Sequence, residues 1–251
     1  MSTDRAFNKN RYIDLSRMAY EKGIYTYTDF LSLAELSDMH GCSREFYVNH
    51  KEFGGYEGAE RCMVSFGSLE ELGYEQDFPI ACIKIEPLMK KFAEDLNHRD
   101  YLGSLMNLGI ERSKMGDIVV TDKSAYVFVV DSLIDIICKD LTRVRHTSVR
   151  ASVVDDVNEL PTPKLKEISI QIHSERIDAI VAKVFNLSRS QSAELFLGQK
   201  IYVDGRLNEN ESHILKEESI VSVRGYGRFK YHGTNGTTRK GNLYAVVDMY
   251  V

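Results

Sequence analysis

The sequence predicts an α+β protein in three parts: a mainly helical N-terminal region at residues 1–76, an α+β middle domain at 77–160, and a small mixed domain at 166–251. Three observations support this division. Apolar residues repeat at helical spacing in the first forty residues. Strand-like and helix-like segments alternate from residue 78 onward. The stretch DDVNELPTPKLKE, which has no periodicity and holds two of the four prolines, separates this pattern from the last part.

The first part contains two helical patterns. Helical spacing of apolar side chains predicts one helix over residues 11–22. Thr28-Asp29 precedes a second periodic stretch that ends at Gly41, which is typical of a capped helix. The segment EFYVNHKEFGGYEGAERCMVSF then predicts two short strands around a glycine-rich loop.

The middle part has a β-α-β-β-α-β order. PIACIKIEP predicts a strand, and PLMKKFAEDLNH predicts a helix with Pro87 in its first turn. GDIVV and AYVFVV are strands around the polar turn TDKS, followed by a helix at 132–139 and one long strand, LTRVRHTSVRASVV. This order is typical of ferredoxin-like and RRM-like domains, with helices on one face of an antiparallel sheet.

The composition is that of a folded, soluble, cytoplasmic protein. Hydrophobic residues make up 43% and charged residues 27% of the chain. The N-terminus does not resemble a secretory signal, and the most apolar run is too short to cross a bilayer. Four scattered cysteines, without a C-x-x-C pair, predict reduced thiols and no metal site.

Charge is distributed unevenly along the chain. The formal net charge is -5, but residues 164–251 contain 13 Lys and Arg against 10 Asp and Glu, or +3, which leaves -8 for residues 1–163. A basic surface in the last part is therefore compatible with an acidic protein.

The last part predicts two helices and a small sheet. The first helix follows Arg176, Ser188 caps the second, and Arg189 lies in that helix's first turn. IYVDG predicts a strand with an Asp-Gly turn, and ESIVSVRGYGRF predicts another strand. We expect the basic residues to share one surface with Tyr226, Phe229 and Tyr231 interleaved. Any one of them alone could be an ordinary solvated charge or an exposed hairpin aromatic, but for the set as a whole we favour the shared surface. The candidate RNA-binding residues are Arg176, Lys183, Ser188, Arg189, Ser190, Gln191, Lys200, Arg206, Arg224, Arg228 and Lys230. Arg143 and Arg145, on one face of the long strand, either add a second phosphate-binding strip or are solvated charges beside the acidic helix around Glu94-Asp95, and we weigh the two equally.

About fifty residues of this part resemble the alpha-L RNA-binding fold of small-subunit ribosomal protein four. The matching motifs are R-I-D at 176–178, S-R at 188–189 and I-Y-V-D-G at 201–205. Two positions depart from the pattern. The usual glycine is offset to Gly198 with Gln199 in its place, and Ser192 stands where alanine is common.

This module also occurs in RNA-modifying enzymes, so the rest of the chain decides between the alternatives. No G-R-L-D-type segment of pseudouridine synthases follows the module, and FGGYEGAER is the only candidate loop for a methyl donor. His98 and Asp100 could form an acid/base pair, but we favour helix caps and a turn around Gly103. We therefore predict no catalysis, cofactor or small-molecule substrate.

Several segments in order along the chain are similar to the bacterial YlmH family. These are RYIDLSRMAYEKGIYTYTDFLSLAE, FGGYEGAER, HRDYLGSLMNLGIERSKMGDIVV and RGYGRFK. The resemblance implies association with the large ribosomal subunit, contact with ribosomal or transfer RNA, handling of stalled ribosomes, and a link to cell division. The alternatives are an RNA-modifying enzyme and a division-site scaffold that binds only protein.

Overall fold

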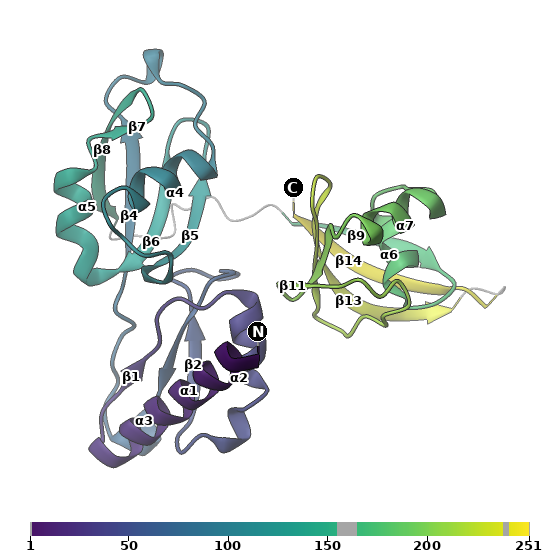
Figure 1. The fold of residues 1–251 in the computed structure, drawn as a ribbon, viewed down its shortest axis with the longest axis horizontal. Coiled ribbons are helices and arrows are strands. Elements are labelled where there is room, and N and C mark those ends of the chain that lie inside the picture. Colours follow the sequence, from purple (N-terminus) through teal and green to yellow (C-terminus); the bar gives the residue numbers. More distant parts are fainter. Residues whose placement is uncertain (1, 155–164, 238–240, 251) are drawn as a thin grey trace. The chain divides into compact units, whose positions relative to one another are not determined.

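The computed structural model describes residues 2–154, 165–237 and 241–250 (Figure 1). The chain forms two compact units, Met1–Pro161 and Thr162–Val251. Among the described residues, no helix has the length and apolar character needed to cross a membrane. The expected separator DDVNELPTPKLKE lies mostly outside the described residues.

The N-terminal lobe of the first unit combines helices with a three-stranded antiparallel sheet of order β1-β3-β2. Its long first helix confirms the helical pattern at 11–22. The second helix is capped by Ser32, four residues after the expected start, because Ser32 and Glu35 form a reciprocal capping box. The elements are α1 (Ser2–Lys22), β1 (Thr26–Tyr27), α2 (Leu33–His40), η1 (Ser43–Glu45), β2 (His50–Phe53), β3 (Met63–Phe66) and α3 (Leu69–Leu72).

The remainder of this unit is a five-stranded antiparallel sheet of order β5-β6-β4-β8-β7. Its four main strands, taken in chain order, are arranged 2-3-1-4, the ferredoxin-like arrangement. Two helices cover one face of the sheet (Figure 1). The elements are β4 (Ile80–Pro87), η2 (Lys90–Phe92), α4 (His98–Met106), η3 (Arg112–Lys114), β5 (Met115–Val120), β6 (Ala125–Val130), η4 (Asp131–Leu133), α5 (Ile134–Asp140), β7 (Arg143–Val144) and β8 (Thr147–Val154).

The helix expected over PLMKKFAEDLNH is wrong. Pro87 ends strand β4 and pairs with Val149, and only the single turn η2 follows. The helix of the β-α-β unit begins at His98, because Asn97 and Asp100 form a capping box there. His98 and Asp100 therefore lie at a helix start as expected, but Gly103 is inside the helix and does not form a turn.

The long strand expected over LTRVRHTSVRASVV is also wrong. The chain turns at Arg145 and His146, so β7 and β8 form a hairpin in which Val144 pairs with Thr147. Arg145 has φ 51°, in the left-handed region. Arg143 and Arg145 thus do not share one strand face.

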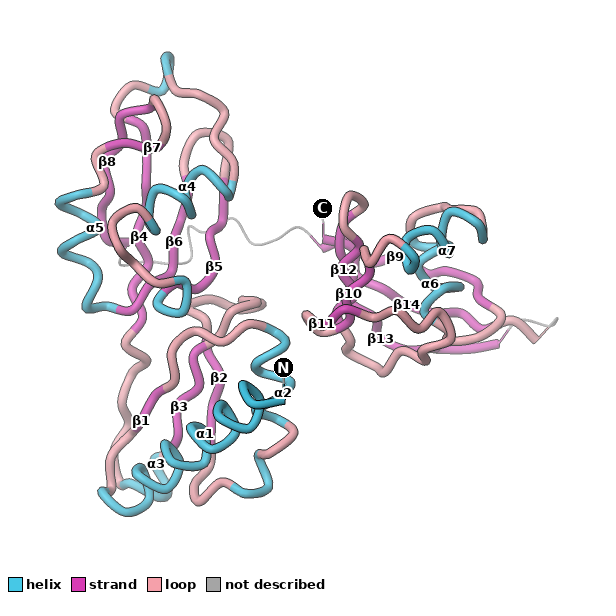
Figure 2. Tube along the Cα trace, viewed as in Figure 1, coloured by secondary structure: helices cyan, strands magenta, loops and turns pink. Residues whose placement is uncertain are grey.

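The second unit is a six-stranded antiparallel sheet of order β11-β10-β12-β13-β14-β9 with two helices packed on one face (Figure 2). Asp204 and Gly205, both at positive φ, form the expected hairpin turn between β10 and β11. The elements are β9 (Leu165–Ile172), α6 (Ile177–Val184), α7 (Arg189–Leu197), β10 (Ile201–Val203), β11 (Arg206–Leu207), β12 (Ile220–Val223), β13 (Gly227–Thr237) and β14 (Leu243–Tyr250).

Candidate nucleic-acid interface

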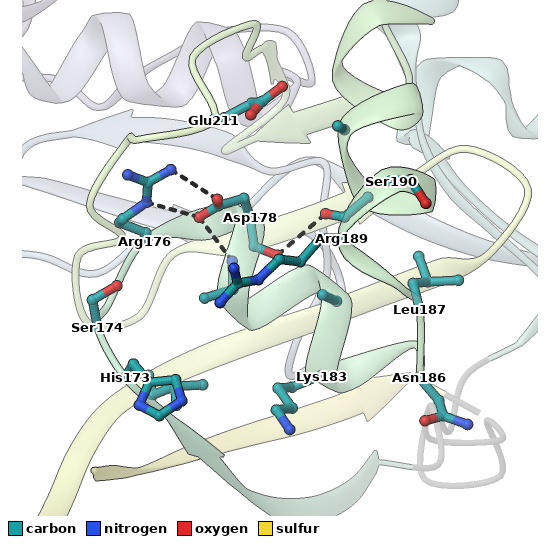
Figure 3. Close-up of a pocket in the computed structure, with 15 residues that line it drawn as sticks. His173, Ser174, Arg176, Asp178, Lys183, Asn186, Leu187, Arg189, Ser190 and Glu211 are labelled. Atoms are coloured by element: carbon teal, nitrogen blue, oxygen red, sulfur yellow. Dashed lines mark hydrogen bonds and ion pairs between the residues drawn. The ribbon is translucent and has the colours of Figure 1, made fainter. Parts of the chain in front are cut away.

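A pocket of about 810 Å³ opens beside α6 and α7 in the second unit (Figure 3). Small side chains from the two helices form part of its lining. Ala179 and Ala182 come from α6, and Ala193 comes from α7. The polar residues of this lining are His173, Ser174, Arg176, Asp178, Lys183, Asn186, Arg189, Ser190, Ser192 and Glu211.

Arg176 is fixed by an acidic neighbour at the start of α6. Its Nε and Nη2 donate to the two carboxylate oxygens of Asp178 at 3.0 and 2.8 Å. Burial alone would raise the pKa of Asp178, but hydrogen bonds from Arg176 and from the Ala179 amide lower it. The carboxylate stays charged near neutral pH, so Arg176 is oriented toward the pocket at the cost of part of its positive field.

Lys183 and Arg189 differ from Arg176 in this respect. Both are exposed on the pocket rim, and within the described chain neither has an acidic partner. Arg189 is the first residue of α7, and Ser190 follows it on the same rim. The N-terminus of a helix adds unsatisfied amides and a partial positive charge, so this edge of the pocket favours an anion.

Three polar residues at α7 have structural roles. Ser188 and Gln191 form the expected cap as a reciprocal capping box, with the Ser188 amide donating to Gln191 Oε1 at 2.9 Å. Buried Ser192, at the position where alanine is common, donates to the Asp178 carbonyl at 3.2 Å. This bond ties α7 to α6 and holds the two walls of the pocket together.

The next group of predicted residues lies outside the pocket, along the β10 side of the sheet. Lys200 is exposed before β10, and Arg206 begins β11. The guanidinium carbon of Arg224 lies 4.6 Å from the centroid of the Tyr202 ring. Tyr202 was not among the candidate residues, although a stack of this kind matches an arginine–aromatic platform for bases.

The sheet divides the β13 residues between its two faces. Phe229 and Tyr231 are fully buried in the core with the helices, so the expectation that they interleave on the basic surface is wrong. Strand alternation places Arg228 and Lys230 on the opposite face. Tyr226, in the preceding turn, is the one expected aromatic residue that is exposed.

The outer face of this sheet is therefore a second polar surface. Arg228 lies over the ring of Tyr250 at 5.4 Å and donates to the Ser222 hydroxyl at 3.1 Å. Lys230 forms an ion pair with Glu218, which reduces its availability to a phosphate. The candidate set thus splits between two faces, and strand alternation in GRFKYH was the signal that could have separated them.

Arg143 and Arg145 belong to the first unit. Both are exposed, and Arg145 Nη1 lies 3.6 Å from Asp100 Oδ1. Asp100 also accepts from the Asn97 amide at 2.9 Å. The carboxylate of Asp100 is thus used in helix capping and an ion pair, in agreement with the favoured structural role.

The FGGYEGAER loop packs the N-terminal lobe onto the middle sheet. It connects the antiparallel strands β2 and β3, whereas a nucleotide-type glycine loop joins a strand to a helix. Asp117 on β5 accepts from the Tyr56 hydroxyl at 2.9 Å and the Glu60 amide at 2.7 Å. Arg61 donates to the carbonyls of Met115 and Phe30 at 3.0 and 2.7 Å. The loop therefore has a complete structural role.

A comparison with protein families finds a match in the middle part of the chain. A family model described as a putative RNA-binding domain in YlmH matches residues 74–158. Over 239 residues, 94% of this chain and 91% of the relative, the chain is 28% identical to the ribosome-associated protein quality control protein P2 of Bacillus subtilis (strain 168).

A solved structure shares the fold. The cell division protein ylmH from Streptococcus pneumoniae matches with a TM-score of 0.52 and 18% identity, covering 64% of this chain and 97% of that chain. At this identity the match shows the fold alone, and it agrees with the α+β class. Together, the family model, the relative and the fold confirm the resemblance of this chain to the YlmH family.

Proposed function

We propose that this protein binds structured RNA through the pocket beside α6 and α7, without catalysing a reaction. The observation that carries the proposal is the pair of exposed cations on one rim, Lys183 in the last turn of α6 and Arg189 at the N-terminus of α7. A guanidinium fork bonds phosphate oxygens bidentately, and the adjacent helix amides favour the same charge. Arg176, Ser190 and Asn186 complete a rim that suits a sugar–phosphate backbone.

The relative from Bacillus subtilis supports a ribosomal partner. We infer that the bound RNA is ribosomal or transfer RNA on the large ribosomal subunit in the cytoplasm, and that the protein acts when ribosomes stall. The family model over residues 74–158 supports a second RNA contact from the middle domain. A role in cell division would then follow from ribosome function and not from a separate scaffold.

The test is charge reversal at the rim. Arg189→Glu in the full chain should weaken binding to ribosomal RNA roughly tenfold or more, because it replaces a phosphate contact with repulsion. Lys216→Glu is the matched control, since Lys216 is exposed in the same unit but does not line the pocket. Fluorescence anisotropy of labelled RNA measures both. Equal affinity of Arg189→Glu and the control would rule out the pocket.

The ribosomal partner has its own test. In a sucrose gradient of cell lysate, the protein should travel with the large subunit at low salt and leave it at high salt, because phosphate contacts release condensed counterions. Migration with free protein at both salt concentrations, or partners that stay attached after nuclease treatment, would contradict the ribosomal assignment.

A further inference from the structure

The connection between β4 and α4 carries an exposed apolar segment, residues 88–92, which we call the tip. Leu88, Met89 and Phe92 are 64%, 65% and 73% exposed. Lys90 and Lys91 lie between them and are also exposed, and Lys91 Nζ is 5.9 Å from the centroid of the Phe92 ring. In Figure 2, the short helical turn η2 stands at the end of this projection. Three large apolar side chains in one five-residue segment are costly to leave in water, which indicates a contact surface.

The tip is held against the β7–β8 hairpin. The Leu88 amide donates to the Ser148 carbonyl at 3.0 Å, and the Glu94 amide donates to Thr147 Oγ1 at 3.2 Å. The His146 amide in turn donates to the Glu94 carboxylate at 3.2 Å. These bonds place the segment Leu88–Glu94 beside the turn that carries Arg145, and Arg143 pairs with Ser148 in the same hairpin.

The acidic groups near the tip already have basic or amide partners. Glu94 accepts from the His146 amide, Asp95 forms an ion pair with Lys123, and Asp100 lies near Arg145. Within the described residues neither Lys90 nor Lys91 forms an ion pair, although Lys90 is near enough to Glu86 to help lower the pKa of that carboxyl. The tip therefore combines apolar side chains with exposed lysines that form no ion pair, a pattern that suits nucleic acid.

The sheet face that RRM domains use for RNA is not available here. RRM domains stack bases on aromatic side chains of the open sheet face. In this chain Phe128 occupies that face of β6 but is fully buried under Tyr56, with the ring centroids 4.9 Å apart and the planes at 22°. Farther along the same face, Lys84 and Arg150 are both within ion-pair distance of Glu86. An RNA bound to the middle domain would therefore contact another surface.

We propose that the middle domain contacts RNA through this tip. Phe92 and Met89 stack on or wedge between unpaired bases, while Lys90, Lys91 and Arg143 bind the flanking phosphates. The partner is RNA with unpaired or splayed bases, since apolar wedges need a base step that opens at low cost. The proposal rests on the proposed function, because it assumes that the protein binds RNA.

The test uses the absence of tryptophan from the chain. Phe92→Trp in the full-length protein introduces a single tryptophan at the tip. Titration with an RNA hairpin that has an unpaired loop should quench its fluorescence saturably, because stacked bases quench indole emission. Lys90→Glu/Lys91→Glu in the same background should weaken this response roughly tenfold. Leu69→Trp, at an exposed position in the N-terminal lobe, is the matched control and should show no quenching.

Binding of the same labelled hairpin is followed in parallel by anisotropy. Hairpin bound by anisotropy, with unchanged fluorescence at the tip, overturns this proposal and leaves the proposed function standing. Hairpin not bound at all by the wild type contradicts both. A fluorescence change with anionic phosphatidylserine vesicles but not with the hairpin would assign the tip to a membrane surface, and this also overturns the proposal.

Discussion

His232 is held between two carboxylates on the outer face of the C-terminal sheet. Its ring nitrogens lie 2.8 Å from Asp248 Oδ2 and 2.8 Å from Glu218 Oε1. Hydrogen bonds to Asp248 and Glu218 raise the pKa of His232 above its ordinary value of 6.5. Glu218 also pairs with Lys230, so the imidazolium joins a charge network across β13, β14 and the turn before β12.

The raised pKa of His232 predicts a pH-dependent stability. A proton bound more tightly in the folded state stabilises it fully below pH 6.5, the unfolded value, and this contribution disappears as the pH rises through the folded pKa. His232→Gln should therefore flatten the fall in unfolding free energy above pH 6.5, measured by urea titration. His173→Gln, at an exposed histidine of the same unit, should leave the fall unchanged. An identical pH profile for His232→Gln and wild type would contradict the network.

Gln199 occupies the position where the related fold has glycine. It follows α7 with φ 53°, so a residue with a Cβ adopts the left-handed conformation. Gln199→Gly should raise the unfolding free energy by roughly 0.5–1 kcal/mol, because glycine adopts this φ without strain. Lys200→Gly, at a position without positive φ, should lower it by a similar amount. Thermal unfolding of the two variants measures both effects. A loss of stability in Gln199→Gly would show that the hydrogen bond from Gln199 to Glu209 contributes more than the relief of backbone strain.

The positions of single residues were predicted correctly where they depend on neighbours in sequence. They were predicted poorly where residues had to be assigned to one or the other face of a strand. Ser188 as a cap, Arg189 in the first turn and the Asp204-Gly205 hairpin all depend on neighbours in sequence. Phe229 and Tyr231 were placed on the surface although alternation with Arg228 and Lys230 put them in the core. The pocket-lining residues His173 and Asn186 gave no signal, because a loop residue becomes part of a pocket only through tertiary packing.

Among the elements, the glycine-rich β2–β3 loop shows how close packing determines sequence. A Cβ on Gly55 would lie 2.2 Å from a Phe128 ring atom, and Gly55 has φ 100°. The same loop contains Gly58 at φ 82° with no atom within 4 Å. Substitution of Gly58 therefore tests the backbone conformation alone, whereas substitution of Gly55 tests the backbone conformation together with the close approach to Phe128.

Gly55→Ala should lower the unfolding free energy by roughly 2–4 kcal/mol, because it adds overpacking against Phe128 to the backbone strain. Gly58→Ala should lower it by only about 1 kcal/mol, since strain at positive φ is its sole cost. Urea unfolding of the full chain measures both. Equal losses in the two variants would show that the loop does not press against the sheet.

Elements with strong periodicity and a clear cap were predicted correctly, and those that lacked a turn signal were not. The strands from Ile80 to Val130 followed their β-branched runs. The segment after Pro87 resembled a helix because Leu88, Phe92 and Leu96 have helical spacing, but the true cap is Asn97. The β7–β8 hairpin was missed because Arg145-His146 is not a usual turn sequence, and its conformation is imposed by pairing of the flanking strands.

At the scale of the whole molecule, the two units carry separate candidate RNA contacts. The pocket rim with Arg189 is in the second unit, and the tip with Lys90 and Lys91 is in the first. When a single RNA molecule binds both contacts, its overall affinity exceeds that of either contact alone, because the second binding step is intramolecular. An RNA too short to reach both contacts occupies one at a time, whereas an RNA long enough to reach both can occupy them together.

This bivalence predicts how charge reversals combine. On full-length ribosomal RNA, Arg189→Glu with Lys90→Glu/Lys91→Glu should reduce the slope of log K against log salt by roughly one per lost contact, about three in total. On a hairpin that occupies one contact at a time, the same combination should reduce the slope by at most about two, because no single complex involves all three lost cations. Anisotropy titrations over a salt series measure both slopes. Identical behaviour on the long and the short RNA would mean that one unit alone carries RNA binding.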